Sequence, residues 1–298
     1  MGTPMSPQST TPSTALLAVD TGGTFTDLVL LRQGRVTTLK VPSTPLDPSQ
    51  AVLDGISKIL SGESGFLLLH GSTVATNALL ERRGAKVALI TNRGFEDVIE
   101  IGRQNRPQLY ALVGHRLPPL VDRDSRLGIS GRLGPRGEEI EELDASELEA
   151  LAARITATGA EAVAICLLHA YANDAHERAV AEEIGATGLP LSVSSELVPE
   201  FREYERTSTT VVNAYVSPIM SRYLGRLSRE AGAARVTIMG SNGGALPVER
   251  ARREPVHTIL SGPAGGVVGA LTWARRSGIE QVISFDMGGT STDVSLCP

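Results

Sequence analysis

One stretch of this chain occurs twice, and it constrains the fold more than any other feature. The pattern D-x-G-G-T-x-T-D runs from Asp20 to Asp27 and again from Asp286 to Asp293, with apolar residues on both flanks. The two copies lie too far apart for a short solenoid repeat. Their spacing suits two halves of one architecture.

Each copy predicts a β-hairpin, because the paired glycines supply the positive φ angles that a tight turn needs. Glycines also let backbone N–H groups approach an anion closely. An aspartate beside that anion indicates a cation between them, and magnesium binds through one or two carboxylates plus phosphate oxygens. Two facing hairpins would clasp a polyphosphate. The alternative is an ordinary hairpin whose Asp and Thr satisfy turn backbone, and the second copy argues against it.

This reading assigns Asp20 and Asp286 as metal ligands and catalytic residues. The residues predicted to bind the phosphates of the cofactor are Gly22, Gly23, Thr24, Thr26, Gly288, Gly289 and Thr290.

Composition excludes several classes of protein. The chain has 298 residues, with 28 basic against 33 acidic side chains and a formal net charge of −5, which argues against a nucleic-acid binder. No stretch is long and apolar enough to cross a membrane. Two cysteines give no disulfide framework, so a reducing, cytoplasmic location is expected. Cys166 lies in an apolar run and is predicted to be buried in a strand. Residues 1–14, rich in Pro, Ser and Thr, are predicted to be a disordered tail.

The first part of the chain alternates strands and helices, which predicts an α/β fold. A helix is expected over 47–60 with Asp47 as N-cap, then a buried strand over 66–70, a helix ending near Arg83, and the strand KVALIT. Such folds bind ligands where strand ends lead into helices. The candidate substrate residues there, for which capping and turn chemistry is an equal alternative, are His70, Thr73, Thr76 and Asn77.

The pattern loosens over 103–142, which predicts an inserted subdomain or a long functional loop. A second α/β layer follows over about 143–198, starting with a helix whose N-cap is Asp144. His176 in a later polar helix is expected to be solvated.

Residues after 199 form a long amphipathic helix that Pro218 is expected to kink or split. Arg206 and Asn213 on it could face a cleft, although a salt-bridged surface is the preferred interpretation. The stretch from Ser261 predicts a helix rich in small residues, whose glycine-rich start could bind an anion.

Several long motifs resemble one family. They read HGSTVATNALLERRGAKVALITNRGFEDVIEIGRQ, FREYERTSTTVVNAYVSPIM, SNGG, LSGPAGGVVGA and FDMGGTSTDVSL. They are similar to the hydantoinase A/5-oxoprolinase family, which includes ATP-dependent acetone and acetophenone carboxylase subunits. The resemblance extends from Leu16 to Leu296.

The resemblance implies an actin-like ATPase fold, with two ribonuclease H-like halves around a nucleotide cleft. It makes 15–198 the hydantoinase/oxoprolinase N-terminal region and 199–298 the beginning of the hydantoinase A domain. The implied cofactors are ATP and Mg, and the implied reaction opens a cyclic amide of hydantoin or 5-oxoproline type through a phosphorylated intermediate. The implied partners are that small-molecule substrate and, as open alternatives, a hydantoinase B-type subunit or further copies of the chain.

The chain stops at Pro298, just past the second hairpin. The expectation is therefore a first half that is complete with an inserted α/β subdomain, and a second half that is only begun. Such a fragment is expected to bind ATP poorly and to be inactive alone. The alternatives are a carboxylase subunit, a small-molecule kinase, and a non-catalytic remnant or interaction module.

Overall fold

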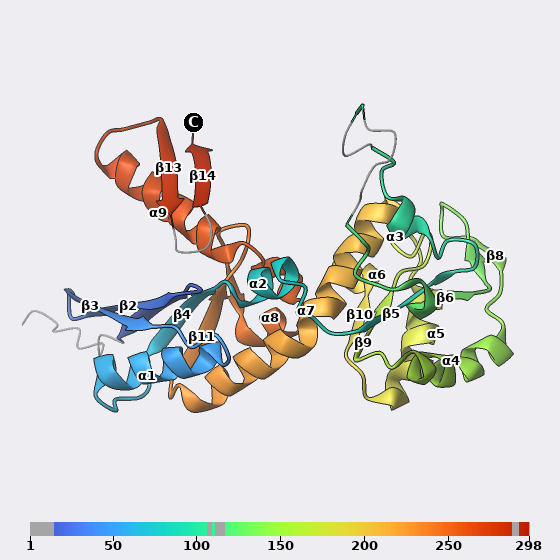
Figure 1. The fold of residues 1–298 in the computed structure, drawn as a ribbon, viewed down its shortest axis with the longest axis horizontal. Helices are drawn as coiled ribbons and strands as arrows, with labels where there is room; N and C mark the ends of the chain where they lie inside the picture. The colour runs from blue at the N-terminus through green and yellow to red at the C-terminus, as the bar shows by residue number, and fades with distance from the viewer. Residues whose placement is uncertain (1–14, 106–108, 111–116, 288–291, 298) are drawn as a thin grey trace, which may run out of the picture. The chain divides into compact units, whose positions relative to one another are not determined.

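The computed structural model describes residues 15–105, 109–110, 117–287 and 292–297 (Figure 1). The predicted tail over 1–14 and the predicted phosphate-binding residues Gly288, Gly289 and Thr290 lie outside these ranges. The chain forms two compact units. Unit 1 contains Met1–Thr73, Arg226–Val248 and Leu260–Pro298, whereas unit 2 contains Val74–Gly225 and Glu249–Ile259.

Unit 1 is built on a six-stranded sheet with the strand order β12-β11-β4-β1-β2-β3. The three central strands β11, β4 and β1 are parallel, and the outer strands are added in antiparallel fashion. The strands are β1 Leu16–Thr21, β2 Phe25–Arg32, β3 Arg35–Pro42, β4 Leu67–Ser72, β11 Arg235–Met239 and β12 Ala245–Pro247.

Helix α1 (Pro48–Leu60) packs against β2 and β3, below the sheet in the view of Figure 1. Asp47 accepts a hydrogen bond from the backbone N–H of Ser49, so the predicted N-cap is confirmed. Gly55 lets the helix approach Leu28, because a Cβ on this glycine would lie 2.7 Å from the leucine side chain. The apolar face of α1 therefore closes the core beneath the first hairpin.

The second hairpin consists of β13 (Val282–Met287) and β14 (Thr292–Cys297), which pair antiparallel, so the predicted hairpin is confirmed. It packs on α9 (Ser261–Arg276), which contacts β4 and β11 of the six-stranded sheet. One face of the hairpin carries large apolar side chains that remain exposed. These residues are Ile283, Phe285, Met287, Val294 and Leu296.

Unit 2 contains a four-stranded parallel sheet with the order β10-β9-β5-β6. Every residue of β5 is buried, as expected for a parallel strand covered on both faces. The strands and helices are α2 Val74–Leu80, β5 Val87–Asn92, α3 Val98–Ile101, η1 Arg123–Ser125, β6 Arg126–Ile129, β7 Arg132–Leu133, β8 Glu139–Glu141, α4 Ala145–Thr158, β9 Ala162–Ile165, α5 Ala175–Ile184, η2 Gly185–Thr187, β10 Leu191–Val193, α6 Ser194–Leu197 and η3 Pro255–Thr258. Two further helices, α7 Glu203–Glu230 and α8 Val248–Arg253, have residues in both units.

The core of unit 2 lies between this sheet and helices α4 and α5. Its fully buried side chains include Ile90, Ile155, Ile165 and Val180. Cys166 is buried as predicted and is not in a disulfide, but it follows the end of β9 instead of lying in the strand. Its pKa is raised by burial.

The structure corrects the reading of residues 66–92 as one strand-helix-strand layer. Strand β4 lies in the sheet of unit 1, whereas β5 lies in the sheet of unit 2. Helix α2 between them ends at Leu80 rather than near Arg83, because Arg82 adopts a left-handed conformation with φ of 53°. The stretch over 103–142 is not wholly an insertion, since β6 pairs with β5 in the main sheet.

Two further expectations about polar residues are wrong, and one of the two alternatives for Pro218, a split helix, is excluded. His176 is buried rather than solvated, and its Nε2 lies 2.6 Å from Glu139 Oε1. Arg206 is buried as well, 3.8 Å from the buried carboxylate of Glu177, so it does not form a surface salt bridge. Helix α7 continues through Pro218 without splitting.

Within the described ranges, no helix combines the length and the apolar character needed to cross a membrane. The architecture is thus a mixed α/β fold in two units.

Candidate functional site

Hydrogen bonds from Ser43, the residue that follows β3, stabilise the turn between β1 and β2. The N–H of Gly22 donates to the carbonyl of Phe25 at 3.0 Å, which closes the turn. Ser43, just after β3, donates its hydroxyl to the Gly22 carbonyl at 2.8 Å and its N–H to the Thr24 carbonyl at 2.9 Å. Thr26 is buried and its Oγ1 lies 3.0 Å from Ser43 Oγ. The tight turn is therefore pre-organised by contacts with Ser43.

Asp20 ends β1 beside two glycines that come from other elements. It lies opposite Gly71 in the parallel register with β4, where a Cβ would approach the Asp20 Oδ1 to 3.0 Å. A Cβ on Gly262 in the first turn of α9 would lie 3.7 Å from the same oxygen. The glycines thus leave open space around the carboxylate that larger side chains would fill.

The carboxylate of Asp20 lies near two other carboxylates. Burial raises the pKa of its carboxyl, and the nearby carboxylates of Asp27 and Asp286 raise it further. The residue keeps some solvent access, but the protein atoms around the carboxylate desolvate it. Asp27 pairs with Lys40 at 3.1 Å, whereas Asp20 has no ion-pair partner among the residues that the structure describes. A divalent cation would relieve this repulsion.

The N-terminus of α9 lies at the same edge of the sheet. Leu260 precedes the helix in a left-handed conformation, and the hydroxyl of the buried Ser261 donates to the carbonyl of Ser72 at 3.3 Å. This bond fixes the start of α9 at the carboxyl end of β4. The backbone N–H groups of Ser261 and Gly262 and the helix dipole favour an anion at this position, although Pro263 contributes no N–H.

These residues fit a magnesium ion and the phosphates of a nucleotide. Glycine-lined space, one carboxylate and the helix N–H groups form the donor set that such a ligand uses. The buried hydroxyl of Thr21, which has no hydrogen-bond partner among the described residues, lies on the opposite face of β1 from Asp20 and is not part of this donor set. No group of three or more His, Cys, Asp or Glu side chains with metal-binding geometry occurs in the described ranges. A cation here would therefore depend on carboxylates together with phosphate and water oxygens.

The structure separates the four candidate substrate residues. His70 is fully buried in β4, with its Nδ1 3.1 Å from the Val19 carbonyl, and burial lowers its pKa to about 4. Thr73 donates its hydroxyl to the Thr21 carbonyl at 3.1 Å, next to Asp20. Thr76 and Asn77 lie on α2 in unit 2. His70 and Thr73 therefore both bond to carbonyls of β1, on either side of Asp20 in the sequence.

Sequence reasoning missed the contributions of Ser43 and Gly71. Ser43 carries no motif of its own, and its role depends on a contact across three strands. In the sequence, Gly71 marks only the end of a predicted strand. Its position opposite Asp20 becomes apparent once β1 and β4 are known to pair. The assignments of Asp20 and Asp286 as catalytic and metal-binding residues stay predictions.

Sequence comparisons place most of the chain in one family. The model of the hydantoinase/oxoprolinase N-terminal region matches residues 16–188, and that of the hydantoinase/oxoprolinase domain matches residues 206–298. Caprolactamase subunit alpha of Pseudomonas jessenii is 39% identical over 303 residues, covering 94% of this chain and 43% of that subunit. The 5-oxoprolinase of Saccharomyces cerevisiae is 33% identical over 330 residues, covering 94% of this chain and 25% of that enzyme.

Solved structures agree with the sequence matches. A nucleotide-free structure of acetone carboxylase, described as ATP-dependent, superposes with a TM-score of 0.85 at 28% identity, covering 96% of this chain and 44% of that one. The ATP-dependent caprolactamase of Pseudomonas jessenii gives 0.80 at 37% identity, covering 94% and 43%. The chain spans less than half the length of these relatives. On both kinds of evidence, the chain belongs to the hydantoinase/oxoprolinase family.

Proposed function

We propose that this chain carries the nucleotide-binding part of an ATP-dependent amidohydrolase that opens a cyclic amide. The observation that carries the proposal is the carboxylate of Asp20, which lies between Gly71 and Gly262 at the N-terminus of α9. The printed names of two similar proteins, a caprolactamase and a 5-oxoprolinase, support the choice of substrate class. An actin-like ATPase fold is part of this proposal, and the mixed sheet of unit 1 is compatible with it.

In this proposal each residue of the site has a separate task. Asp20 holds Mg²⁺, and Asp286 of the second hairpin faces the same cation. The N–H group of Gly23 and the start of α9 would bind phosphate oxygens, since their partial positive charges favour anions, whereas the N–H of Gly22 closes the turn. ATP, when bound, would supply the phosphoryl group that activates the amide oxygen, with ADP as the other product. The protein contributes position and charge neutralisation.

A chimeric enzyme tests the proposal in a complete protein. Residues 15–298 replace the matching region of the caprolactamase alpha subunit, and the chimera is assayed with the remaining caprolactamase components for lactam-dependent release of ADP and phosphate. Asp20→Asn is expected to lower turnover at least about 100-fold, because it removes the charge that holds the cation. Asp54→Asn, on the exposed face of α1, is the matched control and should retain turnover.

Two results would count against this role for the hairpin. One is normal turnover by the Asp20→Asn chimera. The other is a chimera that has native circular dichroism and binds Mg-ATP but shows no turnover with lactams.

A carboxylase subunit is the second candidate, because the acetone carboxylase structure gives the higher TM-score of the two. Sequence identity favours the lactamase, at 39% against 32% for the acetophenone carboxylase gamma subunit of Aromatoleum aromaticum. Product analysis separates them, since a ring-opened amino acid supports the amidohydrolase and a carboxylated ketone supports the carboxylase. In either case we propose that a second subunit takes part, as the subunit names of these relatives suggest.

A further inference from the structure

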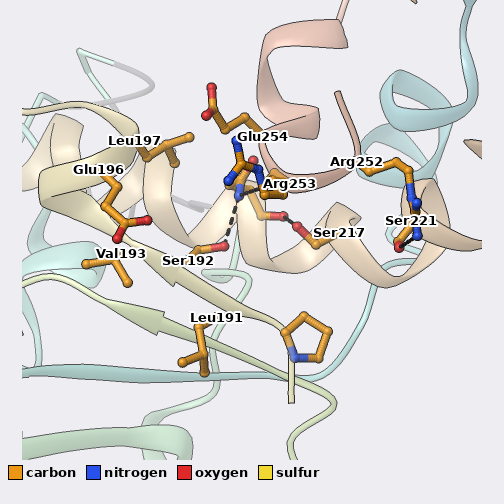
Figure 2. Close-up of a pocket in the computed structure, with 12 residues that line it drawn as sticks. Leu191, Ser192, Val193, Glu196, Leu197, Ser217, Ser221, Arg252, Arg253 and Glu254 are labelled. Atoms are coloured by element: carbon orange, nitrogen blue, oxygen red, sulfur yellow. Dashed lines mark hydrogen bonds between the residues drawn. The ribbon is translucent and has the colours of Figure 1, made fainter. Parts of the chain in front are cut away.

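Unit 2 contains a cavity of about 490 Å³ that the site at Asp20 does not use. Strand β10 and helix α6 form one wall, and helices α7 and α8 form the other (Figure 2). Its volume lies in the range of pockets that hold small molecules. The lining mixes charged, hydroxyl and apolar side chains, which is the composition of a specific site rather than a packing defect.

The walls of the cavity are fixed by Asn213 of α7. Its Nδ2 donates to the hydroxyl of Ser192 on β10 at 2.9 Å and to the carbonyl of Arg253 on α8 at 3.0 Å. Its Oδ1 accepts from the N–H of Val256 at 3.1 Å. Asn213 and Ser192 are both buried, so these bonds connect three elements without exposure to water. The cavity is therefore pre-organised, which lowers the cost of binding a ligand.

Two arginines of α8, Arg252 and Arg253, line the cavity at separate places (Figure 2). The Nε of Arg252 is buried and lacks a hydrogen-bond partner in the part of the chain that the structure describes. The other nitrogens of Arg252 reach Glu249 at 3.1 Å and the Ser221 hydroxyl at 3.5 Å. Arg253, the next residue in the sequence, has no ion-pair partner among the described residues. An unpaired guanidinium and a buried donor without an acceptor each match a carboxylate.

Another side of the cavity combines one free negative charge with apolar surface. Glu196 of α6 lines the cavity, and no cation pairs with it in the described ranges. In Figure 2, Glu196 and Val193 lie at the left, whereas Arg252 lies at the right. The second acidic residue of the lining, Glu254, is already paired with Arg250 at 2.7 Å. The apolar part of the lining consists of Pro190, Leu191, Val193 and Leu197.

We propose that this cavity binds a small aliphatic amino acid in its zwitterionic form. The carboxylate of the ligand lies against Arg253, its ammonium group lies against Glu196, and its methylene chain contacts the leucine and valine side chains. Opposite charges at two ends with apolar surface between them recognise such a molecule and discriminate against a simple anion. The inference goes beyond the proposed function and does not rest on it.

Binding of 6-aminohexanoate to the full chain, measured by titration calorimetry without nucleotide, tests the inference. Hexanoate and hexylamine are the comparison probes, since each lacks one of the two charges. We expect 6-aminohexanoate to bind at least about tenfold more tightly than either. Arg253→Gln should weaken its binding about tenfold or more, and Glu196→Gln should do the same while leaving hexanoate binding unchanged.

Matched controls are Arg222→Gln and Glu149→Gln, which change exposed side chains that do not line the cavity and should alter affinity less than about twofold. Equal affinity for 6-aminohexanoate and hexanoate would show an anion site instead and would refute the inference. So would the absence of binding by all three probes to folded protein. Because the assay contains no ATP, its result is independent of the turnover of the chimera.

Discussion

At the scale of single residues, buried polar side chains make specific contributions to the stability of the fold. His70 is neutral, because burial lowers its pKa to about 4 from an ordinary 6.5, while its Nδ1 donates to the Val19 carbonyl. The unfolded chain takes up a proton near pH 6.5 and the folded chain does not until about pH 4. The stability that neutral His70 contributes is therefore present above pH 6.5 and is lost as the pH falls towards 4.

His70→Gln tests this linkage. The free energy of unfolding of the natural chain should fall by up to roughly 3 kcal/mol between pH 6.5 and 4 through this residue, and the variant should lack that part of the fall. Urea unfolding at several pH values measures it. His257→Gln, which changes a partly exposed histidine, should keep the slope of the natural chain. Identical slopes for the natural chain and His70→Gln would contradict the assignment.

Arg206 gives a second prediction at this scale. Its Nη1 donates to Ser194 Oγ at 2.5 Å and its Nη2 to the Leu167 carbonyl at 2.8 Å, beside the carboxylate of Glu177. Arg206→Met should lower the free energy of unfolding by about 3–5 kcal/mol, since it leaves the buried Glu177 charge without its partner. Arg178→Met removes an exposed pair with Asp174 and should cost less than about 1 kcal/mol. Equal losses in urea unfolding would argue against a special role for the buried pair.

The sequence reveals such residues only where their partners are local. The N-cap of Asp47 could be predicted because Ser49 is two residues away. His176 could not, since its partner Glu139 comes from β8, 37 residues away. At the site, Asp20 was visible in a repeated motif, whereas Ser43 became visible only through its contacts.

At the scale of elements, one glycine decides how α7 packs in unit 2. A Cβ on Gly84 would overlap the ring of Tyr215, and the N–H of Ala85 donates to the Tyr215 carbonyl at 2.9 Å. Gly84→Ala should therefore destabilise the protein by about 1–3 kcal/mol through overpacking. Gly269→Ala, in open space on α9, should instead stabilise it by roughly 0.5–1 kcal/mol. Thermal unfolding of both variants checks the opposite signs, and two shifts of the same sign would contradict the packing argument.

Strands and turns that depend on a few consecutive residues could be predicted from the sequence. Which strands pair with each other across long separations could not. The alternation in β1 and β2 and the turn between them follow from a few consecutive residues. The separation of β4 and β5 into two sheets does not, because periodicity says nothing about which strand lies next to which. Pro218 remains inside α7 because tertiary packing of a 28-residue helix outweighs the loss of one hydrogen bond.

At the scale of the whole molecule, we expect the exposed apolar face of the second hairpin to promote self-association. Phe285 lies opposite Val294 and Ile283 opposite Leu296, and all four side chains are more than half exposed. Contiguous apolar surface of this kind promotes association. Phe285→Thr with Leu296→Thr should raise the concentration at which oligomers form by about tenfold or more.

Sedimentation velocity over a range of concentrations measures this effect. Ser284→Thr, on the opposite face of the hairpin, is the control and should associate like the natural chain. Unchanged association of the double variant would show that another surface is responsible.

The division of the chain into units also sets an order of events during synthesis. Unit 2 draws its sheet from residues 87–193, so this sheet can close before α7 is complete. The sheet of unit 1 cannot close as early, because β4 pairs with β11. Strand β4 ends at Ser72 and β11 begins at Arg235, so β11 is synthesised more than 160 residues later. Until then β4 is paired with β1 on one side only. The nascent chain therefore has an unpaired strand edge at β4, and the proposed nucleotide site is among the last parts to form.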